Sequence, residues 1–158
     1  MIDTPEIMDA IMYGLAKNDN YFDVKDILGS KLFDYRIKKI KCQLKKDTSI
    51  YGIQLFYENI NDGSIKTVID IKSNEKDLID QEFELDNEVI TVMNVWLNDD
   101  ISLIGFEITT DKGRIFKFGY GNDHQLVKSS YFKENQNIIV GFGFYFDGES
   151  GITAIYGK

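Results

Sequence analysis

Hydrophobic and polar residues alternate along most of this chain in the manner of β-strands. From about Leu32 onward, short runs rich in Ile, Phe and Tyr are separated by clusters of Asn, Asp, Gly and Ser. This pattern is typical of a many-stranded β domain. The single proline, Pro5, precedes all of these runs, so none of them is interrupted by proline. We therefore predict one all-β domain over residues 29–158.

The first residues follow a helical spacing instead. Thr4 suits the N-cap of a helix and Pro5 its first helical position. Apolar residues then recur along one helical face, namely Ile7, Met8, Ile11, Met12 and Leu15. We predict a short helical extension over residues 1–28. Its apolar stripe either covers the core of the domain or binds a partner, and the residues alone leave both possibilities open.

A strand–turn–strand unit occurs three times, at intervals of roughly fifty residues. The outgoing strands are Ile37–Leu44, Val89–Leu97 and Ile138–Phe144, and the return strands are Ile50–Leu55, Leu103–Ile108 and Ile152–Tyr156. Each return strand places a small residue just before the second of two large apolar residues, and these small residues are Gly52, Gly105 and Ala154. Three such units bury their apolar faces most simply as three sheets packed with pseudo-threefold symmetry.

A series of segments resembles the jacalin-like lectin family, in the order and spacing of that family and over about residues 29–158. The segments are Gly29–Asp34, Ile50–Tyr57, Phe83–Ile90, Thr110–Arg114 with Phe118–Gly119, Ile139–Phe142, and Ala154–Ile155. The resemblance implies that Gly29–Asp34 is the opening strand. It also implies a β-prism of three Greek-key, four-stranded sheets.

The sugar-binding motif of that family is altered in this chain. The family binds a monosaccharide through a Gly-Gly loop and through a G-x-x-x-D loop before the last strand. Thr153 stands in place of the aspartate and Glu149 in place of the glycine, while Asn61–Ser64 and Lys72–Asp77 occupy the region expected for the Gly-Gly loop. Candidate ligand-binding residues therefore lie in the loop from Asp147 to Thr153, namely Asp147, Gly148, Glu149, Ser150 and Thr153. The carboxylate of Asp147 or Glu149 could replace the missing acceptor of sugar hydroxyls.

Charge and cysteine content limit the classes of partner. The formal net charge of -8 and the pI of about 4.6 disfavour nucleic acid and anionic membrane surfaces. The lysines of Lys38–Lys41 and Lys45–Lys46 are better explained as the solvent face of a strand. One cysteine cannot form an internal disulfide, and the N-terminus lacks the features of a signal peptide. We predict a soluble, cytoplasmic or other intracellular protein that is not secreted and does not insert into a membrane.

The usual catalytic and metal-binding patterns do not occur in the sequence. His124 is the only histidine and lies in a polar stretch, and Cys42 lies in a predicted strand, where a buried and inert thiol is expected. No His or Cys cluster has ligand spacing, so we predict no metal, no cofactor and no enzymatic activity. The alternation of acidic and apolar residues predicts a strand whose carboxylates face water, and these are Glu82, Glu84, Asp86 and Glu88.

Two functional hypotheses follow. The first is a non-catalytic binding module that acts as a protein-interaction or structural subunit of an intracellular assembly, with the N-terminal stripe holding the partner. The alternative is a carbohydrate-binding lectin whose pocket is rearranged in the last hairpin loop. The first predicts a protein partner or larger complex, and the second predicts a glycan ligand.

Overall fold

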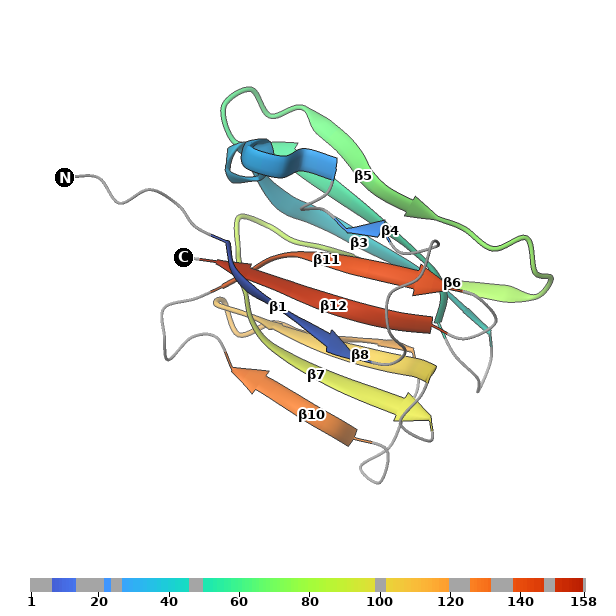
Figure 1. The fold of residues 1–158 in the computed structure, drawn as a ribbon. Helices are drawn as coiled ribbons and strands as arrows, with labels where there is room; N and C mark the ends of the chain where they lie inside the picture. The colour runs from blue at the N-terminus through green and yellow to red at the C-terminus, as the bar shows by residue number, and fades with distance from the viewer. Residues whose placement is uncertain are drawn as a thin grey trace.

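The structure is a computed structural model, and it describes residues 7–13, 22–23, 27–45, 50–98, 102–119, 126–131, 138–146 and 150–157. Within these ranges the chain forms twelve strands and one 3₁₀ helix. The strands fall into three groups of four, and in each group two central strands form a hairpin (Figure 1). The predicted all-β fold is thus confirmed.

The first group is a separate four-stranded sheet with the order β5-β4-β3-β6. Its strands are β3 (Tyr35–Lys45), β4 (Ile50–Asn59), β5 (Ile65–Ile71) and β6 (Leu78–Glu84). Three consecutive antiparallel strands are followed by a fourth that returns beside the first, which is a Greek key. At Gly52 in β4, a Cβ atom would lie 2.5 Å from the carbonyl oxygen of Ile71 in β5. The predicted need for a small residue here is confirmed.

The second group repeats this order as β10-β7-β8-β9. Its strands are β7 (Ile90–Asn98), β8 (Ser102–Thr110), β9 (Ile115–Gly119) and β10 (Leu126–Tyr131). The β7–β8 hairpin is the second of the predicted strand–turn–strand units. Again the fourth strand pairs with the first, so this group is also a Greek key.

The third group, β2-β11-β12-β1, combines the two ends of the chain. Its strands are β1 (Ile7–Tyr13), β2 (Phe22–Asp23), β11 (Ile138–Phe146) and β12 (Ser150–Gly157). The central hairpin is the third predicted unit, and β1 and β2 flank it on either side. The pairing of Ile139 with Ile90 links this group to the second one and makes a continuous eight-stranded sheet.

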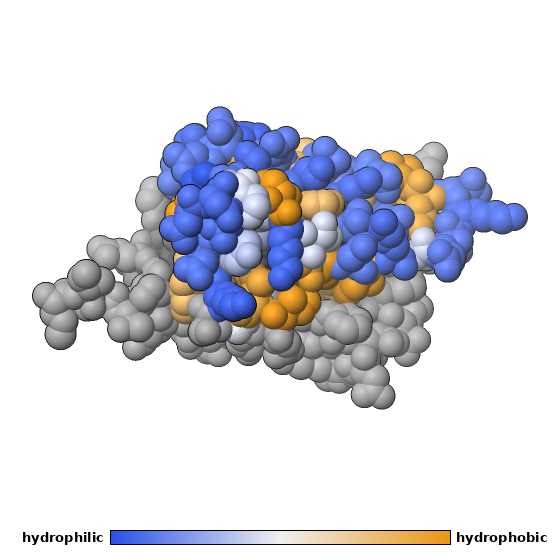
Figure 2. All heavy atoms as spheres, turned by 90° about the horizontal axis from the view of Figure 1, so that it is seen from above, coloured by the Kyte–Doolittle hydropathy of each residue, from blue (hydrophilic) through white to orange (hydrophobic). Residues whose placement is uncertain are grey.

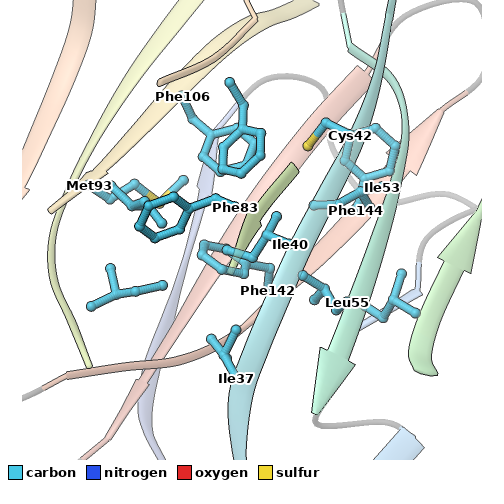
Figure 3. Close-up of a cluster of buried hydrophobic side chains, with 14 of the residues drawn as sticks. Ile37, Ile40, Cys42, Ile53, Leu55, Phe83, Met93, Phe106, Phe142 and Phe144 are labelled. Carbon is cyan, nitrogen blue, oxygen red and sulfur yellow. The ribbon is translucent and has the colours of Figure 1, made fainter. Parts of the chain in front are cut away.

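The core lies where the three central hairpins face one another (Figure 3). Each hairpin contributes fully buried side chains: Ile40, Cys42, Ile53 and Leu55 from the first, Met93 and Phe106 from the second, and Phe142 and Phe144 from the third. The ring centroids of Phe106 and Phe142 lie 5.9 Å apart, so the second and third hairpins are in direct aromatic contact. Burial raises the pKa of the Cys42 thiol, in agreement with the predicted inert cysteine.

The predicted N-terminal helix is wrong over the residues that the structure describes. Ile7–Tyr13 forms strand β1 and pairs antiparallel with β12, with Ile11 opposite Ala154. A short apolar run is compatible with helix or strand, and the unpaired backbone edge of β12 favours the strand. Thr4, Pro5 and Leu15 lie outside the described residues, whereas Met8 and Met12 are part of β1.

The opening strand implied for Gly29–Asp34 is also wrong, because these residues form a 3₁₀ helix. Gly29 enters it with a φ of 54°, a left-handed conformation that glycine adopts without steric cost. Leu28 and Leu32 lie one helical turn apart and are 6% and 2% exposed. The helical turn therefore places both leucines on the core, where an extended strand of this length would separate them.

Candidate functional site

The predicted ligand loop lies at the tip of the β11–β12 hairpin. Ser150 pairs with Phe146, so the two strands are joined by residues 147–149 alone. Asp147, Gly148 and Glu149 lie outside the described residues. Ser150 begins β12, at the edge of the loop.

Thr153 does not belong to that loop. It is an inner residue of β12, opposite Gly143 on β11 and Met12 on β1. The expected loop from Asp147 to Thr153 is therefore too long, because strand pairing continues as far as Ser150. A continuous ladder satisfies the backbone groups that a longer loop would leave unpaired.

The region expected to replace the Gly-Gly loop is a turn that satisfies its own polar groups. The side chain of Asn59 accepts hydrogen bonds from the N–H groups of Asn61 (2.8 Å) and Asp62 (3.2 Å). Asp62 in turn accepts one from the Ser64 N–H at 2.8 Å, and hydrogen bonds with Ser64 lower the pKa of the Asp62 carboxyl. Since these side chains bond within the turn, Asn61–Ser64 does not form an open backbone cradle for a sugar.

The most highly connected polar group in the described residues is Glu88, whose side chain is fully buried. Thr110 Oγ1 donates a hydrogen bond to Glu88 Oε2 at 2.6 Å. Arg114 Nη1 (2.5 Å) and the Asp86 N–H (3.0 Å) donate to Glu88 Oε1. The Arg114 guanidinium also lies 4.4 Å from the ring centroid of Phe83. Both carboxylate oxygens therefore have partners within the protein.

The environment of Glu88 favours its ionised form. Burial raises the pKa of the Glu88 carboxyl, because a charge in a buried site is poorly solvated. Hydrogen bonds from Thr110 and from the Asp86 N–H lower this pKa, and the charges of Arg114 and Lys112 lower it further. The net effect is a pKa below the ordinary value of glutamic acid. Both oxygens of this buried carboxylate are bonded to groups of the protein itself, so Glu88 acts as a structural contact.

The sequence pattern misplaced Glu88. The alternation over residues 82–88 predicted a strand with its carboxylates in water, whereas β6 ends at Glu84 and Glu88 lies inside the protein. The segments that resemble the lectin family, Phe83–Ile90 and Thr110–Arg114, are the two that meet at this carboxylate. The family-like segments in the sequence therefore pointed to the surroundings of Glu88. The contact that they form is a structural one between the first and second sheets.

The outer face of the first sheet carries a ladder of opposite charges, and the lysines on it are partly exposed, as their spacing predicted. Lysines on β3 face carboxylates on the neighbouring strand β6, in the pairs Lys38–Glu84 (3.5 Å), Lys39–Glu82 (3.8 Å) and Lys41–Asp80 (3.6 Å). Each pair is partly exposed, so each contributes little to stability, on the order of 0–1 kcal/mol. Each of these three lysines thus lies beside a carboxylate of the neighbouring strand.

Other expected features are less fully described. In the part of the chain that the structure describes, no group of three or more His, Cys, Asp and Glu residues could hold a metal ion. No helix there is long and apolar enough to cross a membrane. His124 lies outside the described residues.

The three four-stranded groups with a shared core form a β-prism, and solved structures of jacalin-related lectins have a similar fold. Single-chain recombinant jacalin matches with a TM-score of 0.70 and 19% identity, covering 99% of this chain and 97% of that one. Artocarpin complexed with methyl-α-mannose matches with a TM-score of 0.70 and 15% identity, covering 97% and 99%. A mannose-specific jacalin-related lectin from Morus nigra, in complex with mannose, matches with a TM-score of 0.69 and 16% identity, covering 100% and 99%.

These likenesses show that the chain has the jacalin-like β-prism fold, as the sequence resemblance predicted. No protein-family model matches the sequence, and no curated protein sequence matches it. At identities of 15–19% the common feature is the fold, and the site residues are not carried over with it.

Proposed function

We propose that this chain is a non-catalytic carbohydrate-binding domain. The observation that carries the proposal is the match of nearly the whole chain to jacalin-related lectins, two of which were solved with mannose or a methyl mannoside. The match spans all three sheets, including the third sheet that the two ends of the chain build together. The proposal adopts the lectin alternative of the sequence analysis.

The tip of the β11–β12 hairpin is the proposed binding site. Asp147 and Glu149 supply carboxylates, which accept strong charge-assisted hydrogen bonds from sugar hydroxyls. Ser150 adds a hydroxyl at the point where β12 begins. Tyr13, the last residue of β1, pairs with Ile152, so β1 leaves the sheet close to this hairpin tip. Strand β1 therefore ends beside the proposed site.

The protein-interaction hypothesis loses one of its three supports. It rested on the altered sugar motif, on the expected intracellular setting and on an N-terminal helix with an apolar stripe, but Ile7–Tyr13 is a strand whose backbone pairs with β12. A role as a structural subunit in an intracellular assembly stays a prediction, and no contact among the described residues favours it over sugar binding.

Calorimetric titration with mannose, galactose, glucose and N-acetylglucosamine tests the proposed function. We expect at least one sugar to bind. A double variant with Asp147→Asn and Glu149→Gln should raise the dissociation constant of that sugar at least about tenfold, the loss expected for one hydrogen bond to a charged group. Asp70→Asn, on β5 in the separate four-stranded sheet, is the matched control and should leave affinity unchanged. Binding that the double variant leaves intact would contradict the proposed site.

A further inference from the structure

A hollow of about 160 Å³ lies on the outer face of the first sheet. The last hairpin belongs to the other sheet, so the hollow is separate from it. All four strands of that sheet line it, through Lys38 and Lys39 on β3, Phe56 on β4, Ile65 on β5 and Glu84 on β6. Figure 2 looks onto this side of the molecule, where apolar residues appear between hydrophilic ones. This is below the roughly 300–1,000 Å³ of most ligand pockets, so a ligand held here is no larger than about one small ring.

Two irregularities in strand pairing shape the hollow. Ile37 faces Tyr57 and Lys39 faces Phe56, so Lys38 is an extra residue that bulges from β3. The bulge leaves Lys38 and Lys39 both half-buried on the outer side. A second register shift lies between β4 and β5, between Leu55 and Phe56. Bulges often re-aim side chains next to binding sites, and here both lysines line the same hollow.

The charges around the hollow are nearly balanced. Lys38 Nζ lies 3.5 Å from a Glu84 oxygen and 3.8 Å from a Glu58 oxygen, and Lys39 Nζ lies 3.8 Å from a Glu82 oxygen. Two ammonium groups thus face three carboxylates. Glu58 also pairs with Arg36 at 2.8 Å, so three cationic groups stand against three carboxylates. A neutral ligand fits this balance best.

The lengths of these ion pairs suggest the chemistry of that ligand. They exceed the distance of about 2.7–2.9 Å at which ammonium and carboxylate groups form charge-assisted hydrogen bonds. A hydroxyl placed between Lys38 and Glu84 can accept from the first and donate to the second, since a hydroxyl is both donor and acceptor. A phosphate would bring negative charge next to the Glu84 carboxylate, which repels it. Two neighbouring hydroxyls on a ligand could therefore hydrogen-bond to the Lys38 ammonium and the Glu84 carboxylate while these two groups stay paired.

The rest of the hollow is apolar. The half-buried ring of Phe56 lies beside Ile65, which is 54% exposed although it is large and hydrophobic. Lys39 Nζ lies 4.5 Å from the ring centroid and holds its charge close to the aromatic surface. An apolar patch next to a few charged groups is a common design of small-molecule sites. It suits a molecule with hydroxyls at its edge and C–H groups on its faces.

We propose that this hollow is a second carbohydrate site, which holds one neutral sugar ring between the Lys38–Glu84 pair and the Phe56–Ile65 surface. The proposal goes beyond the last hairpin, because none of its residues belongs to the third sheet. A chain with two separate sites would bind branched or clustered glycans more tightly than single sugars, through a raised effective concentration.

Amide chemical-shift mapping by NMR tests the second site. The probes are mannose, galactose, glucose and N-acetylglucosamine, with inorganic phosphate at equal ionic strength as the anionic comparison. We expect at least one sugar to shift the amides of Lys38, Lys39 and Phe56 in a saturable way, and phosphate to leave them unshifted. No saturable shift with any of the four sugars, or an equal response to phosphate, would overturn the proposal.

Two variants of β6 make the test specific. Glu84→Gln removes the carboxylate of the hollow. It should raise the dissociation constant of the sugar, as measured from these shifts, at least about tenfold. The control is Asp80→Asn, on the same strand, because Asp80 pairs with Lys41 outside the hollow. This variant should change the dissociation constant of the sugar less than about twofold. Equal effects of both variants would overturn the assignment. Shifts at Ser150 report separately on the last hairpin, so either site can fail while the other stands.

Discussion

A single carboxylate, Glu88, connects the segment between β6 and β7 to the hairpin between β8 and β9. It accepts from Thr110 and Arg114 on one side and from the Asp86 N–H on the other. Arg114 also donates to the carbonyl oxygen of Glu84, the last residue of β6, at 3.3 Å. The first and second sheets are therefore joined by a compact polar contact in addition to the shared apolar core.

Replacing Glu88 with glutamine should destabilise the protein by about 1–3 kcal/mol at neutral pH, the usual cost of leaving buried hydrogen-bonding groups unsatisfied. Because its pKa is lowered in the folded chain, the Glu88 carboxylate contributes stability above the ordinary pKa of about 4.3 and loses it as the pH falls through the folded value. Urea unfolding of the natural and Glu88→Gln chains at pH 7 and pH 3 measures both effects. The difference between the chains should shrink at pH 3. Asp80→Asn is the exposed control, and a pH-independent difference would contradict this account.

At the scale of secondary-structure elements, β1 is an edge strand that completes the third sheet. It pairs with β12 along Ile7–Tyr13, and β12 pairs with β11 on its other side. Without β1, β12 would itself become an edge with unpaired backbone groups, and such edges promote aggregation.

Deleting residues 1–13 should therefore lower stability and expose β12. We expect a reduced urea midpoint and at least about tenfold faster amide hydrogen exchange in β12, corresponding to the loss of more than 1.4 kcal/mol of protection. The β3–β4 hairpin provides the internal comparison, since it lies in the separate first sheet. If β12 exchanged no faster than before, β1 would not be part of this sheet in solution.

The sequence predicted the three central hairpins well and the N-terminal segment poorly, for a physical reason. The hairpins contain long alternating runs and local turns, so their pairing partners lie close by in sequence. β1 pairs with a strand that ends the chain, and the apolar spacing of Ile7 and Ile11 does not reveal a partner so far away. The same limit applies to Glu88, whose partners Thr110 and Arg114 follow it by more than twenty residues.

At the scale of the whole molecule, the three four-stranded groups form one β-prism, on which we propose two different surfaces for sugars. The hairpin tip was predicted from the altered family motif, although Thr153 lies inside β12 and not in the loop. The hollow on the first sheet could not be predicted, because it depends on a bulge at Lys38 and on residues from four strands. The lysine spacing indicated only that this face is exposed to water.

The central claim is that this β-prism binds carbohydrate, and a glycan-array screen of the intact, folded protein tests it most directly. We expect specific, saturable binding to a limited set of glycans, competed by the free sugar that binds in calorimetry. The variant with Asp147→Asn and Glu149→Gln on the same array should lose most of that signal. Absence of binding to every glycan by a protein that is shown to be folded would contradict the account.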